Sequence, residues 1–105
     1  MYNRYLEKKM EVVPDEEVLG TKIPIELEYY IIESNKNAIS MLSDIDNKAY
    51  GIEIVKKVDD SIYESEMLKD ISTCMEDTRR ILNKLATNTV TPIEMAFVID
   101  DMLAE

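Results

Sequence analysis

An alternation of apolar and polar side chains in the segment IPIELEYYIIES, residues 23–34, constrains the fold of this chain more than any other feature. One face of the segment carries Ile25, Leu27, Tyr29 and Ile31, and the other carries Glu26, Glu28, Tyr30 and Ile32. Successive side chains of a β-strand point to opposite faces, so this period of two predicts a strand with one strongly apolar face.

Three further segments alternate in a similar way, at residues 5–13, 48–58 and, more weakly, 62–71. The polar stretch 35–47 is typical of a loop, and the acidic stretches after Pro14 and at Asp59 and Asp60 are typical of turns. None of these connections suggests a crossover helix, so consecutive strands are expected to pair antiparallel. Gly51, inside the third predicted strand, is expected to mark a bulge or a close approach of another backbone.

A helix is expected at about residues 74–87, where a helical stripe follows a start signal. Thr73 and Glu76 have the spacing of an S/T-x-x-E capping box, with Ser72 as an alternative cap one residue earlier. The apolar stripe consists of Cys74, Thr78, Ile81, Leu82 and Leu85. In this interpretation Cys74 is a buried, unreactive thiol.

A second helix is expected at about residues 92–104, after a stop at Asn88. Thr91 at the cap, Pro92 at the first helical position and Glu94 two residues later form a complete start signal. One broad apolar arc of this helix is expected to dock on the sheet, and it consists of Met95, Ala96, Val98, Ile99, Met102 and Leu103.

These patterns predict a single α+β domain that spans residues 1–105. Its sheet is a three- or four-stranded antiparallel meander within about residues 4–71, and two C-terminal helices follow, packed mainly on one face. The chain has 105 residues, of which 46% are hydrophobic, enough for one core.

The charge of the chain limits its partners. It has 22 acidic and 12 basic residues, with a net charge of −10. Proteins that hold nucleic acid neutralise phosphates with lysine and arginine, so direct nucleic-acid binding is disfavoured, as is binding to anionic membranes. A basic protein partner is favoured by charge complementarity. The lone Cys74, the absence of a secretory signal at the start and the absence of long apolar runs predict a cytoplasmic protein.

No catalytic residue, cofactor or metal site is expected. The chain has no histidine, which excludes nucleophile activation of the Ser-His or Cys-His kind within it. Asp100 and Asp101 are adjacent on a helix, about 100° apart, and do not form an acid/base pair. Asp44 and Asp46 begin like a calcium loop, but Lys48 then falls on a ligand position. A carboxylate-based enzyme is a third, weaker hypothesis. Such enzymes need two carboxylates at a particular distance in space, and the sequence does not give that distance.

Two apolar surfaces are candidate partner contacts. Tyr30 and Ile32 share a strand face, and Val55 lies on the equivalent face of the next strand. This strip is exposed if the helices cover only the opposite face, and buried if the helices or the 35–47 loop cover it.

The other candidate surface lies on the last helix. Ile93 and Phe97 are four residues apart, on a separate side from the docking arc and beside Asp100. They either pack against the preceding helix or are left for a partner or a second copy of the chain. Buried phenylalanine is the commoner case, which favours packing against the preceding helix.

Five segments of the chain carry a resemblance, and they are YYIIES (29–34), AYGIEIVKK (49–57), SEMLKDIS (65–72), NTVTPIEM (88–95) and VIDDML (98–103). Together they resemble a small family of uncharacterised proteins from Gram-positive, often spore-forming bacteria. The resemblance covers roughly residues 24–105 and implies strands followed by a C-terminal helical part. The family has no established activity or site residues, so the resemblance implies none here.

The sequence therefore predicts a non-enzymatic, acidic protein with an interaction or regulatory role. The alternative is an accessory factor that binds a basic DNA-acting enzyme. One example is a recombination directionality factor, which regulates the site-specific recombinase of a mobile element. Both readings require a protein partner, and a homodimer is a further possibility that the exposed stripe would allow.

Overall fold

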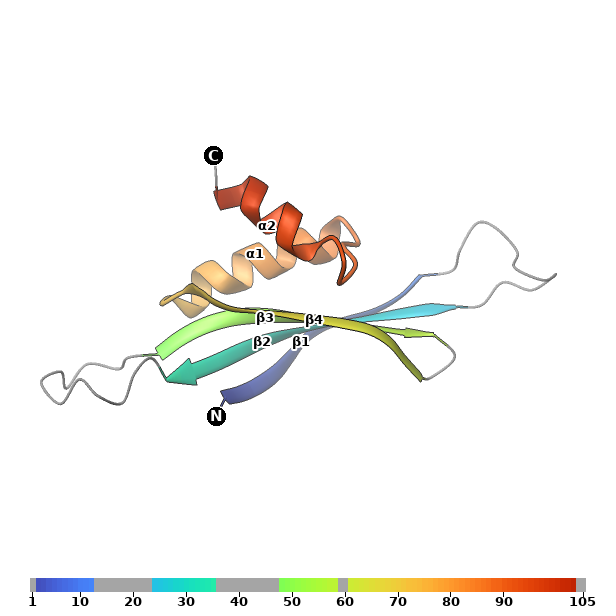
Figure 1. Ribbon diagram of the computed structural model, residues 1–105, viewed down its shortest axis with the longest axis horizontal. Helices are drawn as coiled ribbons and strands as arrows, with labels where there is room; N and C mark the ends of the chain where they lie inside the picture. Colours follow the sequence, from blue (N-terminus) through green and yellow to red (C-terminus); the bar gives the residue numbers. More distant parts are fainter. Residues whose placement is uncertain (1, 13–23, 36–47, 59–60, 104–105) are drawn as a thin grey trace, which may run out of the picture.

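The computed structural model describes residues 2–12, 24–35, 48–58 and 61–103. Four antiparallel strands form one sheet in the order of the chain: β1 (Tyr2–Val12), β2 (Ile25–Asn35), β3 (Lys48–Val58) and β4 (Ser61–Ser72). Two helices follow, α1 (Met75–Thr87) and α2 (Met95–Leu103). Both lie on the same side of the sheet (Figure 1), so the predicted α+β meander with two C-terminal helices is confirmed. Asn35, the first residue of the predicted 35–47 loop, still belongs to β2, and the rest of that loop lies outside the described residues, as do the turns at Pro14 and Asp59.

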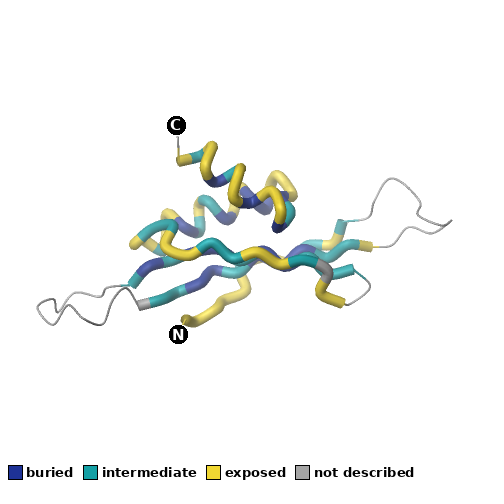
Figure 2. Tube along the Cα trace, viewed as in Figure 1, coloured by how far each residue is buried: buried dark blue, intermediate teal, exposed yellow. Residues whose placement is uncertain are grey.

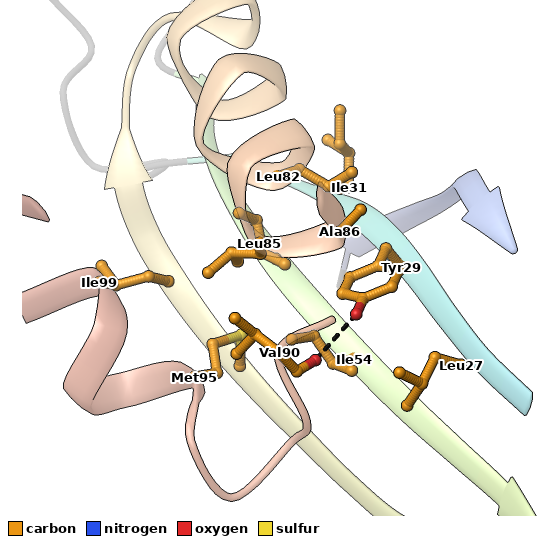
Figure 3. Packing of buried hydrophobic residues seen from close by; sticks show 11 residues of the cluster. Leu27, Tyr29, Ile31, Ile54, Leu82, Leu85, Ala86, Val90, Met95 and Ile99 are labelled. Atoms are coloured by element: carbon orange, nitrogen blue, oxygen red, sulfur yellow. Dashed lines mark hydrogen bonds between the residues drawn. The ribbon is translucent and has the colours of Figure 1, made fainter. Parts of the chain in front are cut away.

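The register of the central strands explains the two faces of the sheet. β2 and β3 pair without interruption from Ile25 opposite Val58 to Asn35 opposite Lys48. Directly paired residues of antiparallel strands project to the same face, so Tyr29 and Ile54 share the helix-covered face. The buried core lies between this face and the two helices (Figure 3), and its members are Leu27, Tyr29, Ile31, Ile52, Ile54, Leu82, Leu85, Ala86, Val90, Met95 and Ile99.

Tyr29 connects the sheet to the segment between the helices. Its side chain is fully buried, and its hydroxyl donates a hydrogen bond of 2.9 Å to the Val90 carbonyl oxygen (Figure 3). Burial raises the pKa of Tyr29 to about 12, with the nearby Glu94 charge as a smaller cause. Val90 lies three residues beyond the end of α1, so this hydrogen bond satisfies a buried backbone carbonyl in the connection between the two helices.

Register shifts interrupt the pairing of both edge strands. The pairing of β3 with β4 shifts between Tyr50 and Ile52, and at Gly51 an added Cβ would lie 2.2 Å from the Leu68 carbonyl oxygen. The predicted close approach at Gly51 is thus confirmed. In β1 the register shifts around Glu7. The Glu7 carboxylate accepts a bidentate pair of hydrogen bonds, each of 3.2 Å, from the Arg79 guanidinium of α1.

The predicted capping box at the start of α1 is wrong. Cys74 is the N-cap, in an extended conformation, and makes no side-chain capping bond. Ser72 instead accepts a 3.0 Å hydrogen bond from the Cys74 N–H. β4 runs as far as Ser72, so Thr73 lies in the bend between strand and helix and cannot act as the cap.

The end of α1 is the expected one, with Asn88 as its C-cap. Thr89 follows with a φ of 53°, its N–H bonds to the Ala86 carbonyl, and the Val90 N–H bonds to the Leu85 carbonyl. These two bonds form a Schellman motif, which ends a helix by a residue in the left-handed region.

The start of α2 differs from the prediction by one turn. Residues 92–94 form a turn, and the helix begins at Met95 rather than at about residue 92. Only half of the predicted box forms: Glu94 accepts hydrogen bonds from the Thr91 N–H at 3.2 Å and from the Thr91 hydroxyl at 2.8 Å. The reciprocal bond of the box does not form, because the Glu94 N–H donates to the Thr91 carbonyl oxygen at 3.1 Å instead of to the hydroxyl.

Candidate interaction surface

The helix-free face of the sheet does not carry the predicted exposed strip. The helices cover the opposite face, as the prediction required, but Ile32 and Val55 are only 1% and 2% exposed, and Tyr30 is half-buried. Ile32 and Val55 are therefore wrong as partner contacts. The strand register places Arg4 directly beside Ile32 and Glu28 directly beside Val55, so long charged side chains border both apolar ones.

These charged side chains form a network across three strands. The Arg4 guanidinium lies 3.6 Å from the centre of the Tyr30 ring and pairs with Glu53 at 2.6 Å. The Tyr30 hydroxyl donates a 2.7 Å hydrogen bond to Glu28, and Lys57 lies 3.4 Å from the same carboxylate.

The electrostatics of Glu28 follow from this network. Burial acts to raise its pKa, but the hydrogen bond from Tyr30 and the Lys57 ammonium outweigh burial and hold the pKa of Glu28 below its usual range. Burial and the bond to Glu28 raise the pKa of Tyr30. Both carboxylates in this network, Glu28 and Glu53, contact a cation, which is typical of a stabilising ladder between strands.

Cys74 is exposed, and the prediction of a buried thiol is wrong. The stripe prediction placed it inside the helix, but α1 begins one residue later, at Met75. The remaining stripe is correct in its main members, because Thr78, Leu82 and Leu85 are buried.

The outward face of α2 is the strongest candidate site. Phe97 is 78% exposed and Ile93 is 66% exposed, and Asp100 beside them is exposed as well. Figure 2 shows exposed positions along the outer side of this helix. The favoured prediction that Ile93 and Phe97 pack against the preceding helix is therefore wrong. We call these three residues, of which Ile93 lies in the turn just before α2, the α2 outward face.

The docking of α2 explains this exposure. Met95 and Ile99 are buried in the core, and Val98 and Met102 pack against it. At 3.6 residues per turn these four residues lie on the side of the helix opposite the α2 outward face. The predicted docking arc is confirmed at these four positions, whereas Ala96 and Leu103 at its margin are exposed.

A groove adjoins the α2 outward face. It has a volume of about 210 Å³ and lies between β4 and the first turn of α2. Its lining residues are Glu66, Met67, Leu68, Pro92, Ile93, Met95 and Ala96. No periodicity in the sequence identifies this groove, because it forms only when α2 docks beside β4. The sequence could predict only that β4 lies at an edge of the sheet, because a meander places its last strand there.

The charge around this surface is acidic. Glu94, Asp100 and Asp101 are exposed on or beside α2, and residues 85–105 contain no lysine or arginine. The hydrogen bonds from Thr91 hold the pKa of Glu94 below its usual range. β4 adds the exposed Glu66 at the groove. An apolar patch with an acidic surround suits a partner that combines apolar and basic groups.

Within the ranges that the structure describes, no group of three or more histidine, cysteine or acidic side chains is placed to hold a metal ion. Asp44 and Asp46, the start of the imperfect calcium loop, lie outside those ranges. No helix in the described part of the chain is long and apolar enough to cross a membrane.

Comparison with known proteins gives one match. A family model described as a family of unknown function (DUF6514) matches residues 8–105. No curated protein and no solved structure matches the chain significantly.

Proposed function

Since the chain belongs to the DUF6514 family, whose function is unknown, we propose a function from its surface: it is an acidic protein that binds a basic protein partner through the α2 outward face. It acts in the cytoplasm, where a lone cysteine stays reduced. It is not an enzyme in this proposal, and it binds neither nucleic acid nor a membrane directly.

The exposure of Phe97 is the observation that carries the proposal. It is the single phenylalanine of the chain, and it lies in solvent beside Ile93 on an ordered helix. Burying such a side chain contributes about 1.5–3 kcal/mol, and the folded monomer gains only a small part of it here. Aromatic side chains that a partner buries at the centre of an interface commonly dominate the binding energy.

The charge of the surface favours a basic partner over a second copy of the chain. In a symmetric dimer built on this surface, Asp100 and Asp101 would approach the same residues of the other copy. Like charges brought together in an interface weaken association. A basic DNA-acting enzyme, such as a site-specific recombinase, is one partner of the favoured class, and the acidic charge is its only support.

Affinity capture with a matched pair of variants tests the proposal. The tagged full chain is incubated with extract from cells that naturally contain it, as wild type, as Phe97→Asp and as Asn83→Asp. Asn83 is exposed on α1, so both variants place one added acid on an exposed helix position. We expect a basic protein that wild type and Asn83→Asp retain and that Phe97→Asp loses.

The captured protein is then purified and mixed with the purified chain. The proposal requires direct binding that weakens as salt rises, because salt screens the attraction between opposite charges. The proposal is overturned if every retained protein tolerates Phe97→Asp. It is equally overturned if wild type forms a homodimer that Phe97→Asp dissociates.

A further inference from the structure

β4 is an edge strand, and the groove lies between it and the first turn of α2. β4 pairs with β3 on one side and ends the strand order on the other. From the groove and its charges we propose that an extended basic segment of the partner binds there as an added strand, with one apolar side chain in the groove. The inference rests on the proposed function, because it describes how the same partner docks.

The lining of the groove indicates a site for an extended backbone. Glu66, Met67 and Leu68 are consecutive in β4, so their side chains point alternately to the two faces of the sheet. A cavity on one face alone would contact only every second residue. Contact with all three residues therefore indicates that the groove reaches the backbone of β4 as well as its side chains. Recognition of a peptide by an edge strand uses such a row of main-chain groups.

The groove accepts one apolar side chain. Met95 is buried at its base, and Ile93 and Ala96 form its wall on the helix side. Its volume of about 210 Å³ exceeds the ~150 Å³ of a cavity that holds benzene. Because Ile93 belongs both to the groove and to the α2 outward face, a segment in the groove continues the proposed contact with Phe97.

The register of β4 specifies the charge pattern of the segment. Glu64, Glu66 and Leu68 face the helix side, at the spacing of two that a paired strand repeats. A basic side chain of the added strand would lie opposite Glu66, and its apolar side chain opposite Leu68. Glu64 is already paired with Lys56 at 3.4 Å, so Glu66 is the principal charge contact.

A second copy of the chain fits the edge poorly. Antiparallel pairing of two β4 strands centred near Glu66 would bring their glutamates together, which destabilises a sheet. On the other edge strand, β1, two of the three cations are already engaged inside its own sheet, because Arg4 pairs with Glu53 and Lys9 with Glu26.

Binding of a designed peptide to the full chain tests this mode. The probe is a short fluorescent peptide in which lysine, lysine and leucine alternate with threonine, made in both chain directions. Its matched control is the same peptide with alternate backbone nitrogens methylated, which keeps every side chain and removes amide donors. We expect fluorescence anisotropy to show binding of one unmethylated peptide, and amide signals of residues 66–68 to shift in NMR spectra.

Charge variants complete the test. Glu66→Lys and Ala96→Lys are expected to weaken peptide binding about tenfold, because a repulsive charge enters the contact. Asn83→Lys, a matched charge change on α1, should have a much smaller effect. Equal binding of the methylated peptide, or no effect of Glu66→Lys, overturns the added strand.

The same variants separate this inference from the proposed function. If the captured partner is lost with Phe97→Asp but bound normally by Ala96→Lys, the added strand is overturned and the α2 outward face stands. If the partner tolerates Phe97→Asp but is lost with Ala96→Lys, the proposed face is wrong and the groove stands.

Discussion

Thr89 holds a backbone conformation that its side chain disfavours. Its φ of 53° lies in the left-handed region, where a β-branched residue is an outlier and which glycine adopts without a steric penalty. The Schellman motif requires this conformation at the end of α1, because Thr89 and Val90 turn back to bond the last carbonyls. The core therefore keeps Thr89 in a strained position.

Thr89→Gly is expected to stabilise the protein by about 0.5–1 kcal/mol, since relief of the left-handed strain exceeds the entropy lost by glycine. Urea unfolding at neutral pH measures the change. Thr87→Gly, inside the last turn of α1, is the matched control and should destabilise instead. A loss of stability in Thr89→Gly similar to that of the control would show that Thr89 is not strained.

Tyr29→Phe is expected to lower the free energy of unfolding by about 1–3 kcal/mol, because the Val90 carbonyl oxygen loses its buried donor. Tyr5→Phe is the control, since Tyr5 is 43% exposed and should tolerate the change. Urea unfolding of both variants gives the comparison. Equal stability of the two would mean that the bond to Val90 contributes nothing.

Alkaline pH gives a second readout of Tyr29. Its folded pKa of about 12 is above the ordinary tyrosine pKa of 10.0, so the folded state keeps a proton that the unfolded state loses. The contribution of Tyr29 to stability is therefore complete below pH 10 and is lost as the pH rises toward 12. Between pH 10 and pH 12, the free energy of unfolding should therefore fall less steeply in Tyr29→Phe than in wild type, as measured by urea unfolding at a series of pH values. Parallel curves would contradict the raised pKa.

Among the elements, the strands were predictable and the helix starts were not. Alternation in β2 identified both the strand and its core face, because the period of two depends only on local geometry. The start of α1 depends on where β4 ends, and the strand extends to Ser72 and displaces Thr73 from the cap. Likewise, Thr91 bonds to Glu94 in a preceding turn, so α2 begins at Met95. The capping signals in the sequence therefore predicted only approximately where each helix begins.

The bulge at Gly51 supplies an element-scale prediction. Gly51→Ala should cost at least about 1–3 kcal/mol, because the added methyl group meets the backbone of β4, which cannot move without disturbing the pairing. Ser65→Ala, on the exposed side of β4, is the control and should change stability little. Thermal melts compare the two variants, and a Gly51→Ala protein as stable as wild type would refute the close approach.

At the scale of the whole molecule, the two layers leave different surfaces open. On the sheet face without helices, ion pairs surround Ile32 and Val55, and both are buried, so the buried alternative holds for these two residues of the predicted strip. The α2 outward face is open, because α2 turns Met95 and Ile99 toward the core. The sequence pattern identified both apolar stripes of α2. It could not predict which stripe is buried and which is exposed, since this depends on how the helix is rotated about its axis when it docks.

The unfolding free energy of Phe97→Ala, compared with that of Leu85→Ala, tests most directly whether Phe97 is reserved for a partner. Leu85 is fully buried, and its truncation should cost about 2–5 kcal/mol. Phe97→Ala should leave the monomer within about 0.5 kcal/mol of wild type, because an exposed side chain contributes little to the core. A loss of about 3–5 kcal/mol in Phe97→Ala would place Phe97 in the core and contradict its role as a free contact.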